Sequence, residues 1–137
     1  QLDDTVENAA QRMLENRIGC VPVLSSDGTV AGIVTQSDFA AKSRCVPFST
    51  FRHPHLLGHW LPLEHAEAIF ERARRLKVQE IMTPRPVTVA ADATLEQTLA
   101  LLLKHDINHL PVMRGEKLVG VVSRFDLLKL MLEKGCP

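Results

Sequence analysis

The sequence of 137 residues has little of what defines several large classes of protein. It has 3 cysteines and no Cys-x-x-Cys spacing, so neither a disulfide framework nor a thiolate zinc site is indicated, and a reducing compartment, the cytoplasm, is expected. The formal net charge is +0, whereas nucleic-acid binding needs a basic face. The longest apolar run, residues 99–103, is far shorter than the roughly 20 residues that cross a bilayer, and the chain opens with no signal-peptide pattern. We therefore expect no nucleic-acid partner and no direct membrane insertion.

A seven-residue pattern occurs twice in the chain. Residues 32–38 read Gly-Ile-Val-Thr-Gln-Ser-Asp, and residues 120–126 read Gly-Val-Val-Ser-Arg-Phe-Asp. An offset of 89 residues, which becomes 88 after the turn at residues 25–28, keeps many further identities in order. They include Asp3 with Asp92, Thr5 with Thr94, Glu7 with Glu96, Ile18 with Ile107, Pro22 with Pro111 and Val23 with Val112. The chain is therefore two copies of one unit, and because units of under about 60 residues bury little surface alone, the copies should share a core.

Each copy is expected to form a helix, two strands and a closing helix. Hydrophobic periodicity and turn residues predict the first helix over residues 5–16 and the strands over residues 21–24, 30–34, 110–113 and 118–122. The closing helices are expected over residues 37–42 and 125–134. Thr5 with Asn8, and Thr94 with Gln97, have the spacing of a capping box, so the first helices of both copies should begin at equivalent places.

The second copy also has a leading strand, residues 86–90, preceded by residues 80–84, Glu-Ile-Met-Thr-Pro. The first copy shows no such strand after Gln1, and a sheet that lacks a strand exposes an edge that another chain could cover. Four leucines at helical spacing in the second copy are interpreted as core residues. They are Leu95, Leu99, Leu102 and Leu103.

Residues 45–78 separate the copies and are expected to contain an amphipathic helix over residues 63–76. Four histidines in this linker could suggest a metal site, but no Asp, Glu or Cys shares their run before Glu64, so solvated or hydrogen-bonded side chains are favoured. They are His53, His55, His59 and His65. Four aromatic residues of the linker are interpreted as packing on the core, with an effector-binding surface as the alternative. They are Phe48, Phe51, Trp60 and Phe70.

The repeated unit resembles the CBS domain, and two such units in tandem resemble a CBS pair, or Bateman module. The resemblance rests on the capped helix, on the Pro-containing strands Cys-Val-Pro-Val-Leu (20–24) and His-Leu-Pro-Val-Met (109–113), and on the motif Gly-aliphatic-x-[Ser/Thr]-x-x-Asp. It implies an α+β fold of two βαββα repeats with pseudo-twofold symmetry, their sheets packed together with flanking helices. Residues 1–44 would form the first repeat, residues 45–78 the linker and residues 79–137 the second repeat.

In the family that the chain resembles, the Asp of the motif contacts ribose, the Ser or Thr contacts ribose or phosphate, and adenine lies in an apolar slot near the leading strand. Carried over to the second repeat, this implies a ligand site at Thr83, Pro84, Val87, His109, Ser123, Arg124 and Asp126. The first repeat offers Thr35 and Asp38. From the residues alone, the same hydroxyl and carboxylate cap a helix, and Arg124 is equally a phosphate contact or a solvated side chain.

The resemblance implies a regulatory module that binds an adenine nucleotide, AMP, ADP or ATP, between the repeats and passes on a conformational change. We expect no catalytic cofactor and no enzyme activity, a homodimer formed through the helices, and an effector that contacts residues 45–78. The cleft of the second repeat is expected to be the occupied one, because Gly19, Cys20 and Gln36 leave the first repeat without positive charge. The alternatives are a dimerisation module without a small ligand and a metal-dependent enzyme built on the linker histidines.

Overall fold

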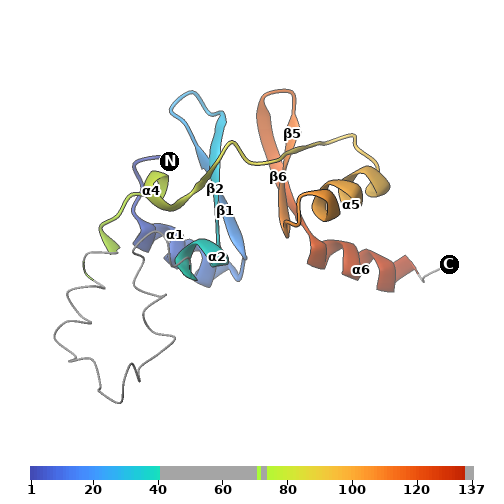
Figure 1. Ribbon diagram of the computed structural model, residues 1–137, viewed down its shortest axis with the longest axis horizontal. Coiled ribbons are helices and arrows are strands. Elements are labelled where there is room, and N and C mark those ends of the chain that lie inside the picture. The colour runs from blue at the N-terminus through green and yellow to red at the C-terminus, as the bar shows by residue number, and fades with distance from the viewer. Residues whose placement is uncertain (41–70, 72–73, 135–137) are drawn as a thin grey trace, which may run out of the picture.

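The computed structural model describes residues 1–40, 71 and 74–134 (Figure 1). The linker histidines and aromatic residues lie outside the described residues, as does nearly all of the helix predicted over residues 63–76. Within the described ranges, no helix is long and apolar enough to cross a membrane.

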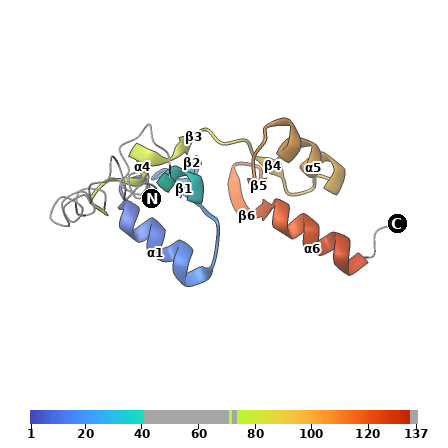
Figure 2. The ribbon, with the colours of Figure 1, turned by 60° about the horizontal axis from the view of Figure 1, so that its bottom comes forward.

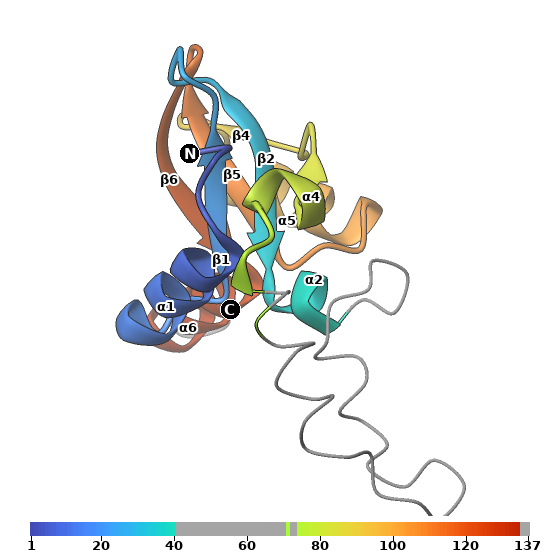
Figure 3. The ribbon, with the colours of Figure 1, turned by 90° about the vertical axis from the view of Figure 1, so that its left-hand side faces the viewer.

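The chain has an α+β fold, as the sequence predicts, and its two halves lie side by side (Figures 1 and 2). The first half, residues 1–40, consists of α1 (Val6–Asn16), β1 (Cys20–Leu24), β2 (Val30–Thr35) and α2 (Gln36–Ala40). The second half, residues 74–134, begins with α4 (Val78–Ile81), β3 (Thr83–Pro84) and β4 (Val89–Ala90). It continues with α5 (Leu95–Lys104), β5 (His109–Arg114), β6 (Lys117–Ser123) and α6 (Arg124–Lys134). Viewed from the first half, α1 and α6 lie at one end of the molecule, away from the tips of the two hairpins (Figure 3).

The first helix of each half begins at the threonine that the sequence indicates. Thr5 accepts a hydrogen bond from the backbone N–H of Asn8 at 3.2 Å. Thr94 accepts from the N–H of Gln97 at 3.2 Å, and the Gln97 side chain accepts in return from the N–H of Thr94 at 2.9 Å. The second half therefore has the complete capping box, and α1 and α5 begin at equivalent positions of the repeat.

One segment, residues 82–90, joins the two sheets and is called the connecting segment below. At its start, β3 pairs antiparallel with β2, with Thr83 opposite Ile33, which gives the first sheet the order β1-β2-β3. At its end, β4 pairs parallel with β5, and the second sheet has the order β4-β5-β6. The sequence assigns Thr83 and Pro84 to the second repeat, but they complete the sheet of the first. The edge of β2 is thus covered from within the same chain.

Among the residues that the structure describes, the core forms two clusters, one in each half, where the sequence predicts a shared core. The first cluster is Val6, Ala9, Val23, Val34, Val78 and Ile81. Val78 and Ile81 come from α4, so the last residue of the predicted linker and a residue of the predicted second repeat stabilise the first half. The second cluster is Val89, Leu102, Leu110 and Leu127.

The prediction that four leucines of α5 are core residues is wrong for three of them. Leu102 is fully buried, whereas Leu95, Leu99 and Leu103 are 54%, 43% and 61% exposed. The helix packs on its sheet through a narrower stripe that includes Leu102 and Thr98, because a small three-stranded sheet covers only part of one helix face. An apolar face of α5 is left at the surface.

Candidate functional site

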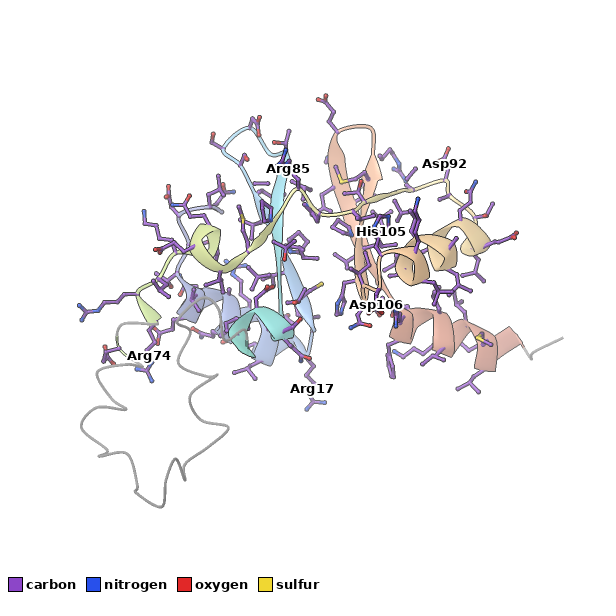
Figure 4. The ribbon with its side chains drawn as sticks, in the orientation of Figure 1. Arg17, Arg74, Arg85, Asp92, His105 and Asp106 are labelled. Carbon is purple, nitrogen blue, oxygen red and sulfur yellow. The ribbon has the colours of Figure 1, made fainter. Side chains whose placement is uncertain are left out.

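A cavity of about 520 Å³ lies between the two halves, within the usual range for small-molecule sites. Its walls come from three places: the end of β2 with the start of α2, the connecting segment, and the turn that leads from α5 into β5. Figure 4 shows two of its charged residues, Arg85 on the connecting segment and Asp106 beside α5.

The first half contributes the Thr-x-x-Asp motif to the cavity. Asp38 accepts hydrogen bonds from the backbone N–H of Thr35 at 2.7 Å and from its hydroxyl at 3.1 Å. Both bonds end on Oδ2, so Oδ1 of Asp38 is not taken up by them. The Thr35 hydroxyl also lies 2.9 Å from that of Ser37, with either atom as donor. The motif therefore holds a half-buried carboxylate in a fixed orientation at the cavity wall.

The connecting segment forms a second wall because it packs directly on β2. A side chain at Gly32 would collide with Met82 and would place a Cβ 2.9 Å from the carbonyl oxygen of Thr83, so only glycine allows this approach. Beyond β3, the backbone N–H of Arg85 donates to the carbonyl of Ala31 at 3.1 Å, and Arg85 takes a left-handed conformation with φ 47°. This turn directs residues 85–87 along the cavity.

The second half closes the cavity with residues 106–109. A Cβ at Gly19 would lie 2.9 Å from Nε2 of His109, so the absence of a side chain there admits the imidazole against the first half. Burial lowers the pKa of His109, and the negative charge of Asp126 opposes this in part. The imidazole is therefore mainly neutral at neutral pH and serves as a hydrogen-bonding group more than as a charge.

The second motif is built like the first but lies outside this cavity. Asp126 accepts from the backbone N–H of Ser123 at 2.8 Å and from its hydroxyl at 2.7 Å. The hydrogen bond from the Ser123 side chain lowers the pKa of Asp126, with smaller contributions from the Ser123 backbone, Lys129 and His109. Arg124 donates to the carbonyl of Leu102 and to Asp106, both at 3.1 Å, so its guanidinium ties the start of α6 to the end of α5.

The structure groups the predicted ligand residues differently from the sequence analysis. It brings Thr35, Asp38, Thr83, Val87 and His109 to one cavity. Pro84 pairs with Gly32 in the sheet and does not line this cavity. Ser123, Arg124 and Asp126 do not line it either. The strand pairing of residues 83–84 with β2 places Thr83 in the sheet of the first half, on the same cavity as Asp38.

Three lining residues are not indicated by any sequence motif: Arg85, Asp106 and Asn108. The repeat alignment pairs Gly19 with Asn108, which marks the two positions as equivalent without indicating that both line one cavity. Among the residues that the structure describes, no group of three or more His, Cys, Asp or Glu side chains is arranged to hold a metal ion.

The fold, two repeats with a cavity between them, is that of a small tandem-repeat module. Comparison with known proteins identifies its family. The CBS domain model matches residues 1–44 and 78–133, so the chain belongs to the CBS domain family. A CBS domain-containing protein of Dictyostelium discoideum is 32% identical over 133 residues, covering 96% of this chain and 82% of its own length. The chloroplastic protein CBSX1 of Arabidopsis thaliana is 26% identical, and the match covers 94% of this chain but 56% of that protein.

Solved structures show the same fold. The CBS domain of a CBS domain-containing membrane protein from Sphaerobacter thermophilus superposes with a TM-score of 0.74 at 36% identity, covering 94% of this chain and 78% of that chain. A protein with CBS domains from Burkholderia ambifaria superposes with a TM-score of 0.71 at 29% identity, covering 98% of this chain and 81% of that chain. The chain is thus a tandem CBS pair.

Proposed function

We propose that the cavity binds an adenosine-containing ligand and that the protein is a regulatory, ligand-sensing module. One observation carries the proposal: the cavity wall combines the Thr35–Asp38 motif of the first half with the connecting segment and the start of β5. A ligand held there touches both halves at once. Its binding free energy therefore depends on how the halves are placed, and it shifts that placement by as much as it prefers one arrangement.

The lining suits the parts of adenosine. Oδ1 of Asp38 is an acceptor for the ribose hydroxyls, and Oδ2 is held by Thr35, so the carboxylate is oriented before the ligand arrives. Ile33, Pro86 and Val87 offer an apolar surface for the base. Thr83 and Asn108 add neutral hydrogen-bonding groups.

Two proteins with this fold were solved with adenosine compounds. CBSX2, at 22% identity and a TM-score of 0.68, was solved in complex with AMP. The CBS pair of MJ0100, at 19% identity and a TM-score of 0.70, was solved with 5′-methylthioadenosine and S-adenosyl-L-methionine. Adenosine is the part that these ligands have in common, and it is the part that we propose for this chain.

Calorimetric titration with adenosine, AMP and 5′-methylthioadenosine tests the proposal. We expect Asp38→Ala to weaken binding by about ten- to a hundredfold, because hydrogen bonds to a charged group contribute about 1.5–3 kcal/mol. Asp126→Ala is the matched control, since it removes the same contact within its own motif and should leave binding nearly unchanged. A protein that binds none of the three compounds, or that loses binding only with Asp126→Ala, contradicts the proposal.

We also propose that the chain forms a homodimer through its exposed helix faces. Apolar side chains of α6 remain at the surface, namely Phe125, Leu128, Leu130, Met131 and Leu132. Leu14 of α1 is likewise exposed, and α1 and α6 lie at the same end of the molecule (Figure 3). Surfaces of this kind usually mark an association site. Light scattering should give twice 15.2 kDa, and a monomer mass at micromolar concentration would contradict the dimer.

A further inference from the structure

The strand β6 is open where the equivalent strand of the first half is covered. In the first sheet β2 lies between β1 and β3, whereas in the second sheet β6 lies at the edge (Figure 3). The connecting segment leaves no room for a side chain at Gly32, but at Gly120 no atom of the described residues, its chain neighbours apart, lies within 4 Å of where a Cβ would be. Ile33 is 6% exposed, and its equivalent in the repeat, Val121, is 37% exposed. Within the described ranges, the second copy therefore has the strand without the segment that covers it.

The sequence of β6 does not protect this edge. Exposed edge strands are usually very short or carry charges, prolines or bulges that prevent pairing with another chain. β6 has 7 residues, and after Lys117 it contains neither a charged residue nor a proline. Its bulge at Val119 is no obstacle, because β2 has the same irregularity at Ala31 and still pairs with β3. The edge of β6 is therefore a template for a further strand.

The cover of β2 shows what kind of segment the repeated strand accepts. That segment is extended and antiparallel to β2, with Pro84 opposite Gly32. The side chain of Met82 occupies the space that a Cβ of Gly32 would need. One residue after the proline, the backbone N–H of Arg85 donates to the carbonyl of Ala31 at 3.1 Å. The strand thus offers an open edge, a glycine and a carbonyl acceptor to a segment that contains Met-Thr-Pro.

β6 presents the same three features at the equivalent positions, with one difference in charge. Gly120 is the glycine and Val119 carries the carbonyl. Lys117, which is exposed, stands where the first copy has Thr29. A partner residue opposite Val119 is two positions from Lys117, a distance that a long acidic side chain can span. An acidic residue after the proline therefore suits β6 better than an arginine does.

We infer that β6 is a docking strand for an extended segment of a partner polypeptide. The segment pairs antiparallel with residues 119–121 and carries an aliphatic-Met-Thr-Pro pattern followed by an acidic residue. It binds by strand addition, in which main-chain hydrogen bonds supply affinity and the side chains that lie over Gly120 supply specificity. This surface is separate from the cavity and from the helix faces proposed for the homodimer, so the inference does not depend on the proposed ligand.

NMR titration of the full chain with a synthetic peptide tests the docking strand. The peptide has the sequence of residues 78–87 with Arg85→Glu, and we expect saturable amide shifts at residues 119–121 with a Kd below about 1 mM. A second peptide that also carries Met82→Asp should bind at least about tenfold more weakly, because its carboxylate would lie against exposed valines. No saturable shift at residues 119–121, or shifts confined to β2, would overturn the inference.

Two variants of the protein test the position and the charge of the site. Gly120→Val meets open space, so it should keep its denaturation midpoint, yet it should weaken the peptide at least about tenfold by blocking the approach of the methionine. Leu103→Ala, which alters an exposed leucine of α5, is the control and should bind as the native chain does. Equal affinity in folded Gly120→Val would overturn the inference.

The charge is tested with the peptide that keeps the native Arg85. The native chain should bind it about threefold more weakly than the acidic peptide, and Lys117→Glu should reverse this order. The same order of the two peptides in Lys117→Glu would overturn the assignment of an acidic partner residue.

Discussion

The two halves share a sequence pattern but differ in how their second strand is covered. Around Gly32, β2 is buried by Met82 and Thr83 of the connecting segment. Around the equivalent Gly120, nothing lies within 4 Å of where a Cβ would be, and Val119, Gly120 and Val121 are exposed. This difference shows that the repeat unit identified in the sequence is not the structural unit that forms the candidate cavity. The segment that precedes the second repeat completes the first.

The largest effect is expected from Ile81→Ala, because Ile81 is 1% exposed in the core cluster of the first half. Loss of this side chain should cost about 2–5 kcal/mol of unfolding free energy. Leu103→Ala, on the exposed face of α5, should change stability by less than about 0.5 kcal/mol. Denaturant unfolding measures both.

Hydrogen exchange sharpens the same comparison. In the Ile81→Ala variant, the backbone amides of Val23 and Val34, which share the cluster of Ile81, should lose protection from exchange. The amides of Leu102 and Leu110, in the other cluster, should lose protection later. Protection lost first in the second half would show that α4 belongs to the repeat in which the sequence places it.

The next effect separates the two glycines. Gly32→Val forces a side chain against Met82 and the Thr83 backbone, and should destabilise the protein by about 1–3 kcal/mol or more. Gly120→Val meets open space and should be close to neutral. Equal losses in thermal denaturation would mean that both strands are covered alike.

The smallest effect concerns the pH dependence of stability. Because burial lowers the pKa of His109 in the folded state, the unfolded chain binds its proton more readily as the pH falls. The contribution of His109 is therefore fully present above the unfolded pKa of about 6.5 and is lost as the pH falls through the folded pKa. His109→Gln should lose less stability than the native chain between about pH 7.5 and 5. An identical pH profile in the two proteins would contradict the buried neutral imidazole.

The sequence predicts the repeats, the α+β fold and the positions of most elements, because hydrophobic periodicity, the capping threonines and the Asp-Gly turn act locally. It also identifies the α5 capping box from Thr94 and Gln97. It does not predict α4, whose four residues Val78–Ile81 are too short to show a helical period. It overestimates the core of α5, since periodicity shows that leucines share a face without showing how wide a sheet covers that face.

The sequence predicts five of the residues that line the candidate cavity, but not how the predicted residues are grouped. The motifs point to Thr35, Asp38, Thr83, Val87 and His109, all of which line the cavity. Which motif faces the connecting segment depends on the pairing of Thr83 with Ile33, a contact between residues 50 positions apart. Arg85 and Asp106 line the cavity through left-handed backbone conformations that no local pattern indicates.

The central claim is that one cavity joins the motif of the first half to the connecting segment, and chemical-shift mapping by NMR tests it most directly. On titration with 5′-methylthioadenosine, the largest backbone amide shifts are expected at Thr35, Asp38, Thr83, Val87 and His109. Shifts concentrated at Ser123 and Asp126, with Thr35 and Asp38 unmoved, would contradict the account and place the ligand at the second motif.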